Sequence, residues 1–386
     1  MIATADQIIF WICAAALAYV YVGYPLLVYL VSILFPKALA KGEIEPRVTV
    51  LITAYNEEAA IREKIENTLQ IDYPTDKLEI VVASDGSTDR TDEIVKEMAG
   101  RGVKLFRQEG RVGKTATQNN AVAAAKGEIV LFSDATTMYS PDVFRTLLPA
   151  FADEMVGCVA GRLVYVDEED TNVGKGAQSY WNYETFIKIA ESRACSLIGA
   201  SGCLYAVRRS AYQPMYPEAC SDFLICTNIY RQGLRSVFAP DAVCFENTNR
   251  RAADEWKMRV RVISQTFTDL WRNRDMLNPL KSGFFAIELI SHKVLRYAVP
   301  FILLTLFISS VFLSASYTFY AVALMIQVLF YLLAAAGWVM ERSGKRVGLL
   351  AMPLYFVLAN LASAAAFYQF LRGETYIRWD PIRQNR

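Results

Sequence analysis

Three long runs without a charged side chain constrain the fold of this chain most. They cover residues 7–36, 297–340 and 347–371. Because a helix needs about 20 apolar residues to cross a bilayer, the runs predict one, two and one membrane spans. Hydrophobic residues make up 54% of the 386 residues, which excludes intrinsic disorder and is high for a purely soluble protein. We therefore expect membrane helices on both sides of a polar middle section.

Charges beside the runs predict the orientation. Lys37, Lys41 and Arg47 follow the first run, which predicts a cytoplasmic middle section in a multi-pass protein of the inner (plasma) membrane. A cleaved signal peptide is the alternative for this run, although no basic segment precedes it. Four full spans would put the basic tail after residue 371 outside, against the same charge rule. The last run is therefore either a span with an exceptional tail or a re-entrant or interfacial segment.

The rest of the composition excludes several kinds of site. With 40 Lys+Arg against 39 Asp+Glu the net charge is +1, so no overall attraction for nucleic acid is expected. A single histidine, His292, excludes a His-rich metal site. The seven cysteines contain no C-x-x-C pair, which disfavours a zinc module or a disulfide framework and favours reduced thiols.

The middle section has the pattern of a soluble α/β domain. Short apolar runs predict strands at residues 48–53, 78–83, 103–107 and 129–132. Helical spacing predicts helices at 58–69, 88–98 and 116–125. This alternation predicts a parallel, doubly wound sheet, with the ligand at the carboxyl ends of its strands. The polar loops at 53–57, 84–89 and 133–136 all fall at that edge.

Two phosphate-binding motifs can be tested in this section. Residues 110–115 (GRVGKT) end like a P-loop, but the P-loop needs a glycine at position 108, which is Gln108. No G-x-G-x-x-G follows the first strand, which disfavours a dinucleotide site. What remains is a nucleotide site whose polar groups come from several loops.

Three acids stand out at the strand–loop edges, namely Asp85, Asp134 and Asp222. Asp134 closes an apolar strand, and a hard cation such as Mg²⁺ often takes one or two carboxylates together with substrate phosphates. Aspartates also cap turns and helices, which is the alternative for any one of the three. Their gathering at one edge favours a functional site.

These motifs, together with the apolar ends, resemble the membrane-embedded family 2 glycosyltransferases, the group of cellulose, chitin and hyaluronan synthases. The resemblance covers about residues 46–300. It implies an α/β, Rossmann-like GT-A domain of the nucleotide-diphospho-sugar transferase type with flanking transmembrane helices. The boundaries we expect are a first helix and linker at 1–45, a cytoplasmic transferase domain at 46–275, an amphipathic interface helix at 276–296, and further transmembrane helices with a basic tail at 297–386.

The resemblance implies roles for residues of the nucleotide loops. Residues 53–57 (TAYNE) and 84–89 (SDGSTD) resemble the first loop and the D-G-S-x-D segment of the family. They imply that Tyr55 and Asp85 contact a uracil ring and that Glu57 contacts the nucleoside. Residues 113–119 (GKTATQN) are similar to the G-K-x(4)-N segment, which implies that Lys114 lies at the diphosphate and that Asn119 belongs to the nucleotide-sugar site.

The family's D-x-D position is matched only in part, because Asp134 is present but Thr136 replaces the second acid. The resemblance implies a divalent cation, Mg²⁺ or Mn²⁺, held by Asp134 and the diphosphate. Residues 220–223 (CSDF) stand where the family has T-E-D, which implies Asp222 as the catalytic base. Residues 199–202 (GASG) resemble the segment on the acceptor side, with Gly199, Ser201 and Gly202.

The largest departure from the family is at residues 258–262 (MRVRV), where processive synthases have Q-R-x-R-W. Arg259 and Arg261 are retained, and guanidinium groups suit the departing diphosphate. A solvated or lipid-facing basic helix is the alternative, since residues two apart do not share a helix face. Val262 replaces the tryptophan that is associated with the acceptor sugar, which disfavours long-chain polymerisation.

Two further segments carry open interpretations. Residues 284–296 predict an amphipathic helix anchored by Lys293 and Arg296 at lipid headgroups, with His292 as an interface or domain contact. Residues 376–379 (YIRW) predict either a membrane-interface segment or an acceptor contact.

The predicted function is that of a membrane-bound inverting glycosyltransferase. It moves a hexosyl or N-acetylhexosaminyl unit from a UDP-sugar to a lipid-linked or glycan acceptor in exopolysaccharide or cell-envelope synthesis, with no nucleic-acid partner. Two alternatives stay open. One is a processive β-glycan synthase that also exports its polymer with an oligomer or partner subunits. The other is a non-catalytic membrane protein that senses UDP-sugars.

Overall fold

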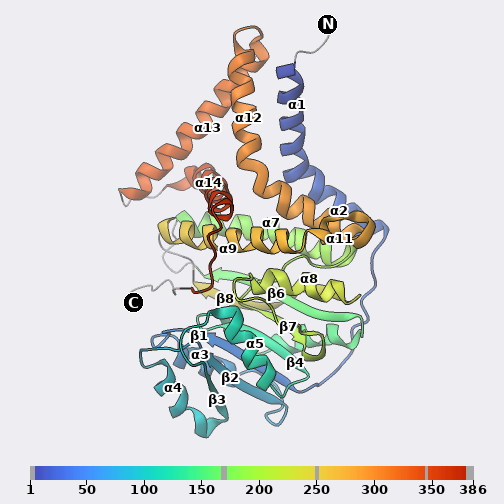
Figure 1. Cartoon of the computed structure of the whole chain (residues 1–386), viewed down its shortest axis with the longest axis vertical. Helices are drawn as coiled ribbons and strands as arrows, with labels where there is room; N and C mark the ends of the chain where they lie inside the picture. The colour runs from blue at the N-terminus through green and yellow to red at the C-terminus, as the bar shows by residue number, and fades with distance from the viewer. Residues whose placement is uncertain (1–4, 167–171, 248–251, 344–346, 380–386) are drawn as a thin grey trace.

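The structure is a computed structural model and describes residues 5–166, 172–247, 252–343 and 347–379. Long helices form one end of the molecule and an α/β domain forms the other, as Figure 1 shows. The sequence prediction of an α/β domain flanked by apolar helices is therefore confirmed. Two arginines of the predicted basic tail, Arg383 and Arg386, lie outside the described residues.

The first half of the domain follows the predicted alternation. Its four parallel strands are β1 (Val48–Ala54), β2 (Leu78–Ser84), β3 (Val103–Arg107) and β4 (Ile129–Asp134). The helices between them are α3 (Ile61–Leu69), α4 (Thr91–Glu97), with the 3-10 turn Ala99–Arg101 after it, and α5 (Lys114–Ala124). Helix α3 begins three residues later than predicted, because Asn56 has a positive φ of 54° and the N–H of Glu57 donates to Thr91 Oγ1 at 2.8 Å.

The second half adds antiparallel pairs, so the whole sheet is mixed, whereas the sequence predicted only its parallel part. It adds β5 (Met138–Tyr139), β6 (Val156–Val166), β7 (Tyr205–Arg208) and β8 (Arg235–Asn247). The strand order is β3-β2-β1-β4-β7-β6-β8-β5. Strand β7 runs antiparallel to both β4 and β6, whereas β6 and β8 are parallel. The reversal occurs at β4, beside the predicted metal residue Asp134.

Buried side chains fill both faces of this sheet. Val50 and Ile52 of β1 face α3, α4, α6 (Val143–Leu147) and the 3-10 helix Leu148–Ala152. Leu51 of β1 faces α5 and α8 (Ser221–Arg231), on the side that also carries the 3-10 turn Arg209–Ala211. Because successive side chains of a strand point to opposite faces, a buried strand of this kind is apolar throughout.

Two helices, α7 (Asn172–Ala194) and α9 (Ala252–Arg272), lie between the sheet and the apolar helices (Figure 1). The first apolar helix is α1 (Ala5–Ala18), a π-turn (Tyr19–Gly23) and α2 (Tyr24–Leu34), and α2 packs on α7. After α9 come a 3-10 turn (Arg274–Leu277), α10 (Pro279–Ser282), α11 (Phe284–Leu289) and a π-turn (Ile290–Leu295). They lead into α12 (Arg296–Ser314), α13 (Thr318–Arg342), a 3-10 turn (Gly348–Leu350) and α14 (Ala351–Leu371).

Within the described residues, four helices are long and apolar enough to cross a membrane: Ala5–Leu34, Phe284–Ser314, Thr318–Arg342 and Gly348–Leu371. The amphipathic segment 284–296 is thus continuous with α12. Its Arg296 pairs with Glu184 of α7, and His292 lies between Glu184 and Glu191, at 3.1 and 2.7 Å. Both side chains contact α7, and the Lys293 ammonium lies 5.6 Å from the Phe223 ring, whereas the sequence analysis expected Lys293 and Arg296 at lipid headgroups.

Helix α14 differs from the other apolar helices. Figure 1 shows it nearly end-on, whereas α1 and α12 run along the long axis. Ala362 and Ala366 of α14 are fully buried against Val260 and Ile263 of α9. The tail that follows runs back to the α/β domain, where the Gln265 amide donates to the carbonyl of Tyr376 at 2.9 Å. The described part of the tail therefore lies against the α/β half of the molecule.

Candidate functional site

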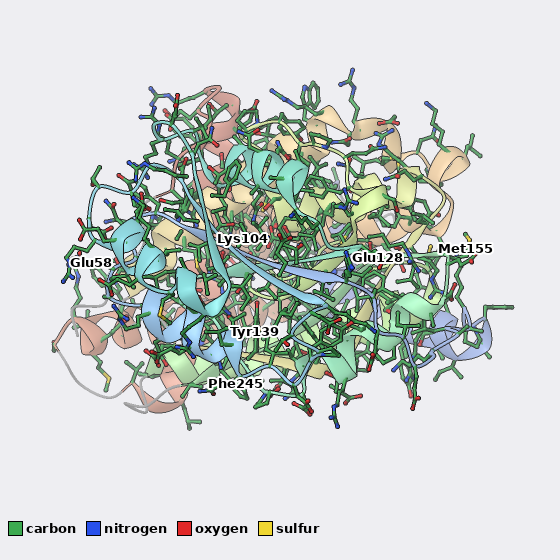
Figure 2. All side chains as sticks on the ribbon, turned by 90° about the horizontal axis from the view of Figure 1, so that it is seen from below. Glu58, Lys104, Glu128, Tyr139, Met155 and Phe245 are labelled. Atoms are coloured by element: carbon green, nitrogen blue, oxygen red, sulfur yellow. The ribbon has the colours of Figure 1, made fainter. Side chains whose placement is uncertain are left out.

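The polar loops predicted from the sequence do meet at one edge of the sheet. Figure 2 shows Glu58, which follows β1, on one side of the sheet, and Glu128 and Met155, which precede β4 and β6, on the other. Across the first edge, the N–H of Asp85 after β2 donates to the carbonyl of Ala54 at the end of β1, at 2.9 Å. This edge carries the carboxyl ends of β1, β2 and β4.

Lys114 and Asp134 form the centre of the site. Lys114 is the first residue of α5, and its ammonium makes an ion pair with Asp134 at the end of β4. Burial lowers the pKa of Lys114, but the ion pair and the charge of Asp222 outweigh burial and leave that pKa above its usual value. Lys114 is therefore a permanent cation beside two carboxylates.

Asp222 lies in the first turn of α8, facing the same space. The Cys220 thiol donates to Asp222 Oδ1 at 3.0 Å. A methyl group on Gly202 would lie 3.3 Å from Asp222 Oδ2 and 3.7 Å from Lys114 Nζ. The missing side chain of Gly202 thus leaves open the space between the carboxylate and the ammonium. The structure brings together the predicted base, the predicted metal residue and the predicted diphosphate residue.

Two predicted ligand residues hold the surrounding loops. Asp85 is fully buried, and its carboxylate accepts hydrogen bonds from the N–H groups of Val112 and Gly113, at 2.8 and 3.0 Å, and from Thr117 Oγ1 at 3.0 Å. Asn119 donates to the carbonyl of Met215 at 2.6 Å. Both side chains shape the site by fixing its loops.

Tyr55 lies in a cluster that the sequence analysis did not assemble. The Arg111 guanidinium stacks 3.9 Å above the Tyr55 ring and donates to the carbonyl of Trp379. The Trp379 ring lies 6.1 Å from that of Tyr55. Trp379 thus lies beside the predicted base-binding loop. The two sequence interpretations of the tail, a membrane-interface segment or an acceptor contact, did not include this position. Glu57 lies in the same loop, next to α4.

The two predicted diphosphate arginines diverge. Arg261 is close enough to lower the pKa of Lys114, and its buried Nε has no partner among the described residues. Arg259 instead pairs with Glu255 at 2.8 Å and donates to the Tyr355 hydroxyl of α14. Of the two arginines, Arg261 is the one whose charge acts on Lys114.

The acceptor-side segment is held by a buried cation that sequence reasoning missed. Lys188 of α7 donates to Ser201 Oγ at 2.9 Å. Burial lowers the pKa of Lys188, while Glu184 and Asp222 oppose this effect. Gly199 lies against Phe223, where an added methyl group would make ordinary contact at 3.4 Å. The segment 199–202 therefore connects α7 to the Asp222 turn.

A second acid, Glu246 at the end of β8, also lies beside Asp134. Thr136 donates from its hydroxyl to Glu246 Oε1 at 3.2 Å. Burial and the charge of Asp134 raise the pKa of Glu246 to about 7. Strands β5 and β8 make this contact, since Met138 pairs with Phe245 and Tyr139 with Cys244; Tyr139 and Phe245 lie close together in Figure 2. A run of strand-forming residues at 236–245 was the available sequence signal.

The donors around Asp134 fit a hard divalent cation. They are carboxylate and hydroxyl oxygens, which Mg²⁺ and Mn²⁺ prefer. An ammonium group already lies on Asp134. Among the described residues, no three His, Cys, Asp or Glu side chains come together. A cation at Asp134 would therefore complete its coordination with substrate phosphates.

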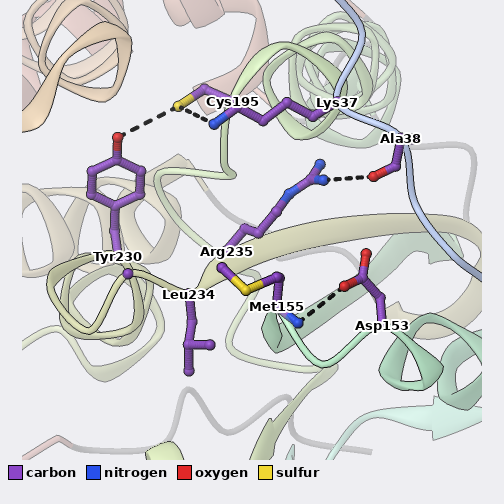
Figure 3. A pocket seen from close by; sticks show the side chains of 9 residues that line it. Lys37, Ala38, Asp153, Met155, Cys195, Tyr230, Leu234 and Arg235 are labelled. Atoms are coloured by element: carbon purple, nitrogen blue, oxygen red, sulfur yellow. Dashed lines mark hydrogen bonds between the residues drawn. The ribbon is translucent and has the colours of Figure 1, made fainter.

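A cavity of about 550 Å³ lies at the opposite end of the sheet (Figure 3). Its lining includes Met155 and Arg235, at the starts of β6 and β8, and Lys37 of the linker. The Arg235 guanidinium donates to the carbonyl of Ala38 at 2.9 Å. The cavity contains none of the predicted site residues.

Comparisons with known proteins identify glycosyltransferases as relatives of this chain. Residues 49–215 match the family model described as "Glycosyl transferase family 2". The chain is 27% identical over 231 residues to "Probable glycosyltransferase YdaM" of Bacillus subtilis, covering 56% of this chain and 54% of that protein. It is 26% identical over 222 residues to "Poly-beta-1,6-N-acetyl-D-glucosamine synthase" of Staphylococcus aureus, covering 55% and 53%. The chain thus spans about half the length of these relatives.

A shorter match and a solved structure complete the comparison. The chain is 30% identical over 135 residues to "Beta-monoglucosyldiacylglycerol synthase" of Nostoc, covering 34% of this chain and 29% of that protein. The solved structure is the mannosyltransferase PcManGT of Pyrobaculum calidifontis in complex with GDP-Man and Mn²⁺. It has a TM-score of 0.72 at 25% identity and covers 95% of this chain and 99% of that chain. The likeness to PcManGT includes the apolar helices, whereas the family model stops at residue 215.

Proposed function

Because this chain belongs to glycosyl transferase family 2 through residues 49–215, we propose that it is a membrane-bound inverting hexosyl- or N-acetylhexosaminyltransferase. Its donor is a UDP-sugar, and its acceptor is a membrane-associated glycan or glycolipid of an exopolysaccharide or cell-envelope pathway. The observation that carries this proposal is the meeting of Lys114, Asp134 and Asp222 around the open space at Gly202.

The reaction is a single displacement at the anomeric carbon. An Asp222 carboxylate oxygen takes the proton of the acceptor hydroxyl while the hydroxyl oxygen forms the new glycosidic bond to the anomeric carbon. The bond from the anomeric carbon to the phosphate oxygen breaks, and its electron pair leaves with the nucleoside diphosphate. Lys114 and Arg261 stabilise the charge on this leaving group. A divalent cation held by Asp134, when bound, neutralises the diphosphate further.

The donor nucleotide has a specific second candidate. PcManGT, which resembles this chain over almost its whole length, holds GDP-Man. The motifs at Tyr55 and Asp85 favour a uracil ring by resemblance, whereas this relative favours a guanine. A GDP-sugar, such as GDP-mannose, is therefore the alternative donor.

The arrangement of the helices supports an acceptor that comes from the membrane. Helices α7 and α9 lie between the site and the apolar helices, and both supply residues to it, Lys188 and Arg261. With α14 packed on α9 and the tail beside the domain, we propose three crossing helices, an interfacial α14, and a cytoplasmic domain in the inner membrane. Three crossings and Val262 in place of tryptophan favour addition of single sugars over polymer export.

The test is a donor screen with the purified full chain in detergent and membrane lipid. UDP-glucose, UDP-galactose, UDP-N-acetylglucosamine and GDP-mannose are each supplied with Mg²⁺ or Mn²⁺, and release of the nucleoside diphosphate is measured. We expect nucleoside diphosphate release from one donor, and mass spectrometry of the lipid acceptor should show the addition of a single sugar. A high-mass ladder would favour the processive alternative. Binding of nucleotide without release from any donor would favour a sensor.

A further inference from the structure

The second acid of the D-x-D pattern is absent from the segment after β4, where Thr136 stands. In the fold, a different acid takes a place beside it. Glu246 comes from β8, 110 residues further along the chain, and accepts a hydrogen bond from the Thr136 hydroxyl at 3.2 Å. The pairing of β5 with β8 fixes this contact, because both strands belong to the same sheet.

We propose that Glu246 supplies the second carboxylate of the divalent-cation site at Asp134, and that Thr136 orients it. The proposal rests on the proposed function, which requires a nucleoside diphosphate at this edge. A pair of carboxylates with phosphate oxygens is a common ligand set for Mg²⁺ and Mn²⁺. Thr136 thus stands where the D-x-D pattern has a metal ligand, and its hydroxyl orients the Glu246 carboxylate that takes over this role.

The charges around Glu246 support this role. Within the described part of the chain, no Lys or Arg side chain forms an ion pair with Glu246, whereas the nearby Glu255 is paired with Arg259. The Lys114 ammonium is shared with Asp134. An oxygen-coordinated cation between Asp134 and Glu246 would therefore add positive charge beside a carboxyl group that makes no ion pair with the described residues.

Helix α3 also holds the segment that follows Asp134 and carries Thr136. Lys64 of α3 is fully buried and donates to the carbonyl of Thr137 at 2.6 Å. Asn67 donates to the carbonyl of Tyr139 at 2.9 Å and accepts from the N–H of Tyr139 at 2.8 Å. Ligands held in this way lose little conformational entropy when the cation binds. Because phosphates complete the coordination, Mn²⁺ affinity depends on bound nucleotide.

The test measures Mn²⁺ binding rather than turnover. The full chain in detergent is titrated with Mn²⁺ without nucleotide, with UDP and with GDP, and free Mn²⁺ is followed by electron paramagnetic resonance. We expect tight binding only with nucleotide. Glu246→Gln should weaken it by about tenfold or more, in line with the effect of disturbing a metal's supporting shell. Thr136→Asp added to Glu246→Gln should restore affinity, since it rebuilds the D-x-D pattern.

Glu255→Gln is the matched control, because Glu255 lies close enough to influence Glu246 but holds Arg259. Its effect on Mn²⁺ affinity should be much smaller, and an equal loss would overturn the ligand role in favour of a general charge effect. Unchanged Mn²⁺ affinity in Glu246→Gln would also overturn the proposal. It would leave the proposed function intact, which fails separately if no donor releases a nucleoside diphosphate.

A second variant covers the case in which Glu246→Gln does not fold. Glu246→Cys replaces a hard oxygen ligand by a soft thiolate, which favours Cd²⁺ over Mn²⁺. If Glu246 is a ligand, the ratio of Cd²⁺ to Mn²⁺ affinity with nucleotide should rise well above that of the unmodified chain. An unchanged ratio would overturn the proposal.

Discussion

The sheet edge of the candidate site and the helices and tail that cover it are built differently. At the sheet edge, Tyr55, Asp85 and Asp134 each stand directly at the end of a parallel strand. In the covering layer, Arg261 comes from α9 and Trp379 from the tail, and packing between distant elements positions them. The sheet edge thus follows from local patterns and sheet topology, whereas the covering layer depends on how helices pack over the sheet.

Replacement of Asp222, in the first turn of α8 over the sheet edge, should have the largest effect. Asp222→Asn keeps the size of the side chain but removes the base, so we expect turnover to fall by about 10²- to 10⁴-fold. Nucleotide binding should persist, because Asp222 is assigned to the acceptor hydroxyl. Nucleoside diphosphate release and calorimetric titration measure the two effects. Asp275→Asn, at the Arg231 ion pair, is the control, and full turnover in Asp222→Asn would contradict the base assignment.

The two arginines of α9 sharpen the comparison. Arg261→Met should lower kcat/KM by about 10²-fold, because a cation beside the leaving diphosphate is lost. Arg259→Met should have a smaller effect on kcat/KM and should instead lower thermal stability, since Glu255 would lose its ion pair with Arg259. Steady-state rates and melting temperatures in detergent distinguish the two. Equal losses of kcat/KM would mean that both arginines reach the donor.

The open space at Gly202 gives a smaller and purely steric test. Gly202→Ala places a methyl group 3.3 Å from Asp222 Oδ2, so we expect kcat/KM to fall by about tenfold as the reacting groups are displaced. Gly100→Ala, outside the candidate site, is the control, because its methyl group would meet nothing within 4 Å. Comparable activity in the two variants would show that the space beside Gly202 is not used.

The last test concerns stability and pH, where no change in turnover is expected. Asp269 of α9 is buried, accepts from the N–H of Cys220 at 3.0 Å, and burial raises its pKa to about 8. The folded chain keeps a proton that the unfolded chain releases above about pH 4. Stability should therefore fall as pH rises from about 4 to about 8, by at most about 1.4 kcal/mol per pH unit, and level off above.

Asp269→Asn removes the titrating group and should flatten this dependence. Melting temperatures of both proteins in detergent between about pH 6 and about pH 8 measure it, since this window lies below the raised pKa. A parallel decline in the two proteins would show that Asp269 titrates normally.

The comparison also explains which parts of the fold were predictable. The four parallel strands and their helices were expected from apolar runs, and their observed ends differ by a few residues. Where the ends differ, as at Asn56 before α3, contacts with another loop decide the local backbone. Strands β5 to β8 were not predicted. The antiparallel direction of β7 depends on its contacts with β4 and β6, which are distant in sequence, so no short stretch of sequence specifies it.

Sequence alone determined that long apolar helices flank an α/β domain and that Asp85, Asp134 and the loop at residues 53–57 share one edge. Hydrophobic periodicity and strand order act over short distances, so a local pattern suffices for these features. Only the tertiary structure decided that the charge of Arg261 acts on Lys114 while Arg259 contacts Tyr355 of α14, that the tail lies beside Tyr55, and that Glu246 lies beside Thr136. These contacts join residues about 100 or more positions apart, and they exist only where buried surfaces bring their elements together.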